Sequence, residues 1–186
     1  MKNAFIAFLI MISQTAVGQT GAVTSGSIET LDTRYGFLGN KFDTPLSQFK
    51  GLIFIENRGG EKVFKKAPNK KLGARASIKY VKYYFYKDRL SSVQVIASNS
   101  LENEESWLEL LHAAYGPAQD TVVNKNSDEI ESGNYGSVYL WGGKRARINF
   151  SSYLGRDISI YVGSTDISLR QKADSQKALK QAASRL

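Results

Sequence analysis

The stretch SIKYVKYYFYKDRLSSVQVIA, residues 77–97, decides the fold because it reads as one long β-hairpin. Two runs rich in Tyr, Phe, Val and Ile flank Lys87 and Asp88, which predict a two-residue turn. A similar design returns in VYLWGGKRARINF, residues 138–150. Aligning the two stretches of sequence matches Phe85, Tyr86, Val93 and Val95 with Leu140, Trp141, Ile148 and Phe150. This match predicts either a duplicated unit or two unrelated units that share ordinary patterning.

Length and composition favour one globular domain. The chain has 186 residues, a hydrophobic content of 42% and three prolines, which is enough to bury a core of its own. Its formal net charge of +8 suggests nucleic acid or an acidic surface as a partner, and the placement of the charge decides how much this means. Cysteine is absent, which excludes disulfides, thiolate metal sites, a cysteine nucleophile and lipid attachment at cysteine.

Residues 1–18 have the features of a secretory signal peptide. A basic start at Lys2 precedes an apolar run over residues 4–12, and small residues end at Gly18. The run is about half of the ~20 residues that a membrane-spanning helix needs, which disfavours a retained anchor. We therefore expect cleavage near Gly18, a mature chain with no transmembrane span, and a periplasmic or secreted protein.

The remaining chain divides by composition. Residues 19–33 are small and polar and predict a flexible lead-in, residues 34–165 a single α+β domain, and residues 166–186 a basic C-terminal helix. Because this last helix has few large apolar side chains, we expect it to be energetically separable from the domain, so that truncation after Asp166 leaves the melting temperature nearly unchanged.

Within the domain, helix and strand patterns alternate. Thr44 and Pro45 predict a short helix start, and residues 52–55 a buried strand. Residues 58–75 predict an exposed basic loop. Asn103 predicts the cap of a helix that ends before Gly116. Shorter apolar runs predict strands at 121–123 and 158–162, and Asp166 is the expected cap of the last helix.

These elements predict an α+β fold with a mainly antiparallel sheet and helices on one face. The sheet would come from two helix–strand–hairpin units, residues 36–97 and 101–162, followed by the C-terminal helix.

The order of elements resembles that of a known class of exported bacterial proteins. Two helix segments, GFLGNKFDTPLSQF and ESWLELLHAAYGP, alternate with the hairpins KYYFYKDRLSSVQV and VYLWGGKRARINF. This arrangement resembles the tandem helix–hairpin fold of the β-lactamase inhibitor proteins and of small outer-membrane assembly lipoproteins, and it also looks like many uncharacterised exported proteins. The chain lacks the lipidation cysteine of the lipoproteins and the disulfide of the inhibitors, so the resemblance implies a fold and transfers no functional residue.

The residues predict no catalytic centre, no cofactor and no metal site. The single histidine, His112, follows Glu109 by three positions, which is half of a di-metal motif without its second copy. A Gly-x-Ser-x-Gly elbow is absent, and Gly142-Gly143-Lys144 lacks the spacing of a phosphate-binding loop. An envelope hydrolase remains the weakest of three functional hypotheses.

The first hypothesis is a binding module for an envelope or extracellular protein. Strand alternation places Phe85, Val93 and Val95 with Leu140, Ile148 and Phe150 on the core face. The aromatic binding face would then consist of Tyr84, Tyr86, Tyr139, Trp141 and the neighbouring Arg147. The alternatives are that the N-terminal segment or the last helix covers these rings, or that the face assignment is shifted by one residue.

The second hypothesis is binding of a polyanion or anionic surface by the basic loop and the start of the hairpin, residues 58–82. Its candidate residues are Lys62, Lys65, Lys66, Lys70, Lys71 and Arg75. The alternative for this segment is a solvated loop without a ligand.

Overall fold

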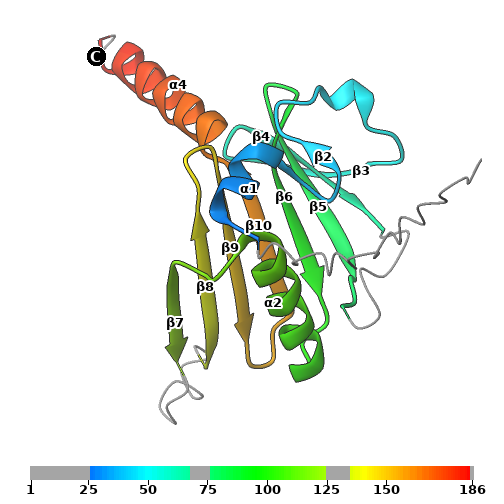
Figure 1. The fold of residues 1–186 in the computed structure, drawn as a ribbon. Helices are drawn as coiled ribbons and strands as arrows, with labels where there is room; N and C mark the ends of the chain where they lie inside the picture. Colours follow the sequence, from blue (N-terminus) through cyan, green and yellow to red (C-terminus); the bar gives the residue numbers. More distant parts are fainter. Residues whose placement is uncertain (1–25, 68–75, 125–134, 185–186) are drawn as a thin grey trace, which may run out of the picture.

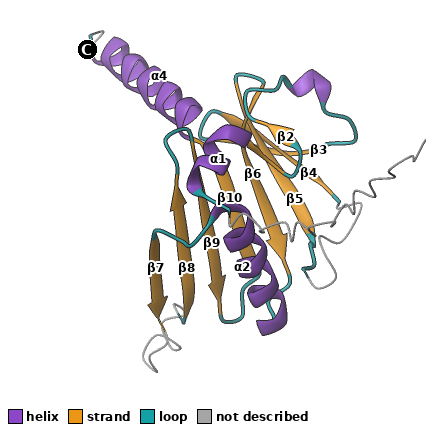
Figure 2. Cartoon of the chain, viewed as in Figure 1, coloured by secondary structure: helices purple, strands orange, loops and turns teal. Residues whose placement is uncertain are grey.

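The computed structural model describes residues 26–67, 76–124 and 135–184 and shows an α+β fold. A two-stranded ladder, β1-β2, accompanies an eight-stranded antiparallel sheet. Three α-helices complete the described part of the chain (Figures 1 and 2). The predicted signal peptide, residues 1–18, lies outside the described residues.

The bounds of the elements follow in chain order. They are α1 (Ile28–Arg34), β1 (Gly36–Phe37), β2 (Asn40–Lys41), the 3-10 helix η1 (Leu46–Gln48), β3 (Ile53–Arg58), β4 (Glu61–Lys66), β5 (Tyr80–Tyr86), β6 (Arg89–Ala97), α2 (Leu101–Tyr115), β7 (Asp120–Asn124), β8 (Gly136–Gly142), β9 (Ala146–Tyr153), β10 (Ile158–Ser164) and α4 (Thr165–Ala183).

The large sheet has the strand order β3-β4-β5-β6-β10-β9-β8-β7. Each half is therefore a four-strand meander, and the last strands of the two meanders, β6 and β10, pair at the centre. By position in its meander, the hairpin β5–β6 corresponds to β9–β10 and not to β8–β9. The predicted pair of helix–strand–hairpin units is consequently not confirmed in that form.

The hairpin β5–β6 has the predicted turn. Lys87 and Asp88 both have positive φ, 49° and 59°, which is the backbone of a tight hairpin turn. Lys62 of β4 donates a 2.8 Å hydrogen bond to the Asp88 carboxylate, and Lys87 is 2.6 Å from Asp174 of α4. Ion pairs on both sides thus hold a turn that has no glycine.

The core lies between one face of the sheet and the helices α1 and α2 (Figure 1). Trp107, Leu111 and Tyr115 of α2 are buried there, as the helical spacing predicts. The helix begins earlier than expected, because Ser100 and not Asn103 is its N-cap. The Asn103 side chain is buried and instead bonds the backbone at Ser77 and Ser98.

The prediction of a flexible lead-in is wrong for residues 26–33. Leu31 of α1 is fully buried in the core, and the Gly26 N–H donates to the Ala113 carbonyl at the end of α2. Only one face of this short helix is covered, so most of its side chains can be polar. Leu31 is its buried residue.

Two other predicted segments take different structures. The helix expected after Thr44 is only the 3-10 turn η1, which begins after Pro45. Residues 58–66 of the predicted basic loop belong to the hairpin β3–β4, whose turn is formed by Gly59 and Gly60 with positive φ. β4 is a strand despite its charge because it pairs with β3 and β5 on its two sides and buries Val63.

The C-terminal helix α4 projects from the end of the sheet, as expected from its thin apolar face (Figure 1). Ser164, rather than the predicted Asp166, caps it and accepts a hydrogen bond from the Ile167 N–H. Ile167 is its one buried residue. No helix in the described part of the chain is long and apolar enough to cross a membrane.

Candidate functional site: the open face of the sheet

The open face is the side of the large sheet opposite α1 and α2. Side chains alternate between the two faces of each strand, so the paired rows identify its members. One such row joins Lys65, Lys82 and Gln94 across β4, β5 and β6. The same row continues from Gln94 to Tyr161 of β10, Asn149 of β9 and Leu140 of β8. None of the described helices packs across this row (Figure 2).

A chain of hydrogen bonds crosses the middle of the open face. The Tyr84 hydroxyl donates to Gln94 at 2.7 Å, and the Gln94 amide donates to Ser159 at 2.8 Å. The Tyr84 and Tyr161 rings meet edge to face, with centroids 6.0 Å apart. Burial raises the pKa of Tyr84 to about 12, which further favours the neutral hydroxyl that donates to Gln94. These contacts fix two large aromatic rings on rigid strands.

Glu61 adds a desolvated carboxyl group beside these rings. It accepts a hydrogen bond from the hydroxyl of Ser91, the extra residue where the register of β5 and β6 shifts. Burial raises the pKa of Glu61, and the Ser91 hydrogen bond opposes this effect only in part. A bulge therefore brings a serine to an otherwise buried carboxyl group.

A hollow of about 620 Å³ opens on the β8–β9–β10 side. Leu140 and the Tyr161 ring supply its apolar lining, and Arg147, Asn149 and Asp120 supply charged or polar groups. Its volume matches that of a site for several side chains or a small ligand.

A second hollow, of about 540 Å³, lies on β3, β4 and β5. Its lining combines two isoleucines and a tyrosine with three lysines: Ile53, Ile55, Tyr80, Lys65, Lys79 and Lys82, together with Ala67.

The structure places two of the predicted aromatic residues on the other face. Trp141 is 1% exposed and its indole N–H donates to the Gly116 carbonyl at 2.9 Å. Tyr139 packs edge to face on Phe150 of the core. The face assignment of β8 was therefore wrong by one residue, and Leu140, expected in the core, lies on the open face. Val138-Tyr139-Leu140-Trp141 is apolar at every position, so alternation alone could not decide its direction.

The remaining predicted residues of the aromatic face divide as follows. Tyr84 and Arg147 lie on the open face. Tyr86 lies at the end of β5, where its hydroxyl donates to Asp174 of α4 at 2.6 Å. The last helix therefore contacts the Tyr86 side chain, which was one of the alternatives that the sequence left open.

The basic residues do not form one patch among the described residues. Lys65 faces the open side, whereas Lys62 and Lys66 pair with Phe85 and Val81 of the core face. Lys62 forms an ion pair with Asp88. The other predicted residues, Lys70, Lys71 and Arg75, lie outside the described residues.

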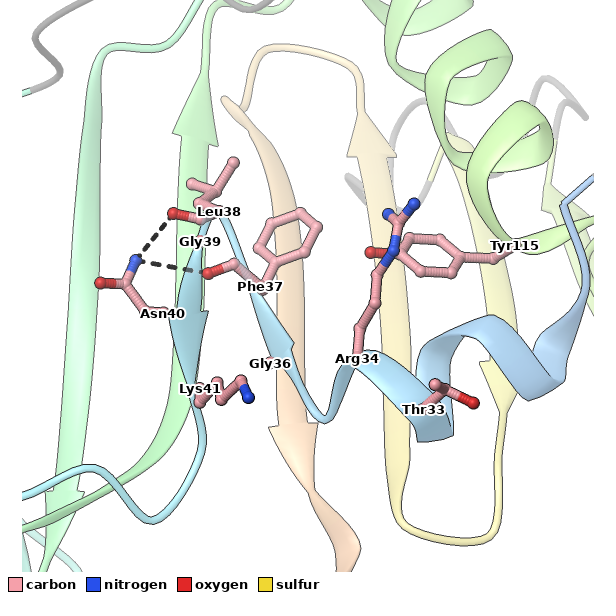
Figure 3. Close-up of a pocket in the computed structure, with 9 residues that line it drawn as sticks. All are labelled: Thr33, Arg34, Gly36, Phe37, Leu38, Gly39, Asn40, Lys41 and Tyr115. Atoms are coloured by element: carbon pink, nitrogen blue, oxygen red, sulfur yellow. Dashed lines mark hydrogen bonds between the residues drawn. The ribbon is translucent and has the colours of Figure 1, made fainter.

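The helix side has a smaller hollow, of about 290 Å³, beside β1 and β2 (Figure 3). Its polar groups serve the fold: the Asn40 amide bonds the carbonyls of Phe37 and Leu38 and closes the β1–β2 turn. The Arg34 guanidinium lies 5.5 Å from the ring centroid of Tyr115. We assign this hollow no binding role.

His112 is exposed on α2, and its ring packs against Trp141 at a centroid distance of 5.7 Å. Across the described ranges, no group of three or more His, Cys, Asp or Glu side chains could hold a metal ion.

Comparisons of the chain with protein-family models, with curated proteins and with solved structures found no match. The arrangement of the open face is thus the basis for a functional proposal.

Sequence reasoning missed Tyr161, Tyr80 and Glu61. The signal for Tyr161 was present, because Ile158, Ile160 and Val162 alternate as core residues and leave Tyr161 on the opposite face. Glu61 could not be found, because its burial depends on a bulge in a different hairpin.

Proposed function

We propose that the chain is a non-enzymatic binding module that recognises another protein, in the cell envelope or outside the cell, through the open face of its sheet. The observation that carries this proposal is the 620 Å³ hollow, where Arg147 lies beside an apolar lining formed by Leu140 and the Tyr161 ring. All three residues belong to strands of the large sheet. Tyrosine and arginine are enriched among the few residues that dominate the binding energy of protein interfaces, which cluster near the centre of the interface.

Burial and hydrogen bonding support the proposal. Ordering a long side chain on binding costs about 0.5–1.5 kcal/mol. The Tyr84 ring is already held by Gln94, and the Tyr161 ring by its contact with Tyr84, so this cost falls mainly on Arg147. A preorganised face of this kind suits recognition of a folded partner.

An enzyme is less well supported. In the described part of the chain, Glu61 is the carboxyl group with a burial-raised pKa, and its hydrogen-bond partner is a serine without an adjacent histidine. His112 lies on the helix side, away from the open face.

Photo-crosslinking in the cells that produce the protein tests the proposal. A photoreactive phenylalanine analogue replaces Asn149, which is exposed and lines the hollow, and in a matched variant it replaces exposed Lys172 of α4. We expect a discrete protein adduct from position 149 and none of the same mass from position 172. The further change Arg147→Glu should reduce the adduct at 149, whereas Lys177→Glu should leave it unchanged.

The proposal fails if position 149 yields no adduct in these cells. It fails equally if both positions give the same adducts, because such labelling would reflect general collision and not a defined face.

A further inference from the structure

The edge strand β3 leaves an apolar stretch exposed. It is the first strand in the sheet order, and all six of its residues are exposed. Ile53, Phe54 and Ile55 are 59%, 51% and 39% exposed. Natural sheets usually protect an edge with charges, proline or bulges. In β3 the charges stand at the far end, on Glu56 and Arg58, and the register shifts between Phe54 and Glu56. Within the described part of the chain, no second strand covers the outer side of the N-terminal half, and its side chains are apolar.

Two lysines that have no acidic partner among the described residues lie next to this edge. Lys65 and Lys82 are directly opposite in the β4–β5 ladder, and Ile53 is the next residue in the same row. Like charges directly opposite across two strands are destabilising. Within the described ranges neither ammonium group forms an ion pair with an acidic side chain, whereas Lys79 pairs with Asp157 at 2.6 Å.

The 540 Å³ hollow lies between the exposed apolar edge of β3 and the two lysines. It is lined by the isoleucines of the edge and by Lys65 and Lys82, with Tyr80 beside them. A ligand that fills it must satisfy apolar surface and positive charge together. A symmetrical pairing of two copies through β3 does not meet this requirement, because it would bring two lysine-lined hollows together and add repulsion.

We propose that β3 pairs with an extended acidic segment of the partner protein, which adds a strand to the sheet. Backbone hydrogen bonds to β3 would supply affinity, and alternate side chains would supply specificity. Neighbouring strands lie about 4.8 Å apart, so a strand added outside β3 lies about 9.6 Å from β4, a distance that the long side chains of Lys65 and of a glutamate on the open-face side can span together. An apolar side chain two positions along would lie against Ile53 and Ile55. This inference rests on the proposed function for the class of partner, but it uses a different part of the open face.

Binding of model peptides tests the proposal. The probe is a fluorescein-labelled peptide of alternating glutamate and valine, and its control has lysine in place of glutamate. We expect the anisotropy of the acidic peptide to rise with protein concentration and its affinity to fall as salt increases, with no binding of the basic peptide. Amide hydrogen exchange of residues 53–58 should slow in the complex, because strand addition protects the β3 backbone.

Two pairs of substitutions separate charge from strand pairing. Lys65→Glu with Lys82→Glu should weaken the acidic peptide about tenfold or more. Ile53→Ser with Ile55→Ser, which removes the apolar side chains of the edge without changing its charge, should reduce both affinity and exchange protection. The matched control is Lys172→Glu with Lys177→Glu on exposed α4, which should change neither. Circular dichroism establishes that each variant is folded.

Several results would overturn the proposal. These are no binding of the acidic peptide, binding without protection of residues 53–58, and equally tight binding of single-stranded DNA or anionic vesicles, which would indicate a general polyanion surface. Sedimentation that shows self-association through β3 would assign the edge to a second copy. Loss of this inference would leave the adduct at position 149 intact, whereas failure of the proposed function would remove that adduct as well.

Discussion

Asp32 is the side chain that joins the N-terminal helix to the hairpin β8–β9. Its carboxylate accepts backbone N–H groups of Lys144, Arg145 and Ala146 at 2.7, 2.7 and 3.2 Å. Burial acts to raise its pKa, but these three backbone hydrogen bonds outweigh burial and lower it. The link spans more than a hundred residues of sequence, so no local pattern could reveal it.

We predict that Asp32→Ala lowers the free energy of unfolding by about 1–2 kcal/mol, because it leaves the turn N–H groups without their acceptor. Since the pKa of Asp32 is depressed in the folded chain, its contribution is present above the unfolded value of 3.8 and is lost as the pH falls through the folded value. Urea unfolding at pH 7 and at pH 3 measures both effects. A variant that is equally destabilised at the two pH values would contradict the assignment.

Glu61 has the opposite pH dependence. Because burial raises its pKa in the folded chain, the stability linked to the protonated carboxyl is complete below the unfolded value of 4.5 and is lost as the pH rises through the folded value. We predict that Glu61→Gln, which keeps an oxygen acceptor for Ser91, stabilises the chain at pH 7 more than at pH 4. Urea unfolding checks this. An equal effect at both pH values would show that the carboxyl is well solvated.

At the scale of elements, α4 consists of an anchored start and a projecting end. Ile167 is 2% exposed, Gln171 donates to the Gly59 carbonyl at 2.7 Å, and Asp174 contacts Tyr86 and Lys87. Among the described residues beyond Asp174, side-chain hydrogen bonds are internal to the helix. The expectation that the whole helix is separable must therefore be restricted to the residues after Asp174, because truncation after Asp166 would also remove Ile167.

We predict that truncation after Asp174 changes the free energy of unfolding by less than about 0.5 kcal/mol, since residues 175–184, the described part of the removed segment, are exposed. Ile167→Ala should cost about 2–5 kcal/mol, because it leaves a cavity in the core. Chemical denaturation compares the two variants. A larger loss from the truncation than from Ile167→Ala would show that the distal helix contributes to the fold.

The elements differ in how well sequence predicts them. The hairpin β5–β6, the helix α2 and the strands β7 and β10 follow from periodicity and turn residues, because these signals are local. Which side of β8 lies in the core could not be predicted in this way, because both sides of the strand are apolar. The contact of Trp141 with the end of α2 shows which side is buried.

At the scale of the whole molecule, the α+β class was predictable, but the strand order was not. A meander can be read from successive strands, whereas the central pairing of β6 with β10 joins segments more than sixty residues apart. The open face is a consequence of that pairing, since it places Gln94 beside Ser159 and Tyr84 beside Tyr161. The candidate site was accordingly predicted only in part, through Tyr84 and Arg147.

Thiol labelling of single-cysteine variants tests most directly whether the open face is free to bind a partner. The chain has no cysteine, so each introduced thiol is unique. The variants are Asn149→Cys on the open face, Lys172→Cys on exposed α4 and Ser137→Cys, which is 2% exposed on the helix side. In the isolated full chain, we predict that a maleimide modifies position 149 about as fast as position 172 and far faster than position 137. Labelling at 149 as slow as at 137 would show that another part of the chain covers the face, and would contradict the account.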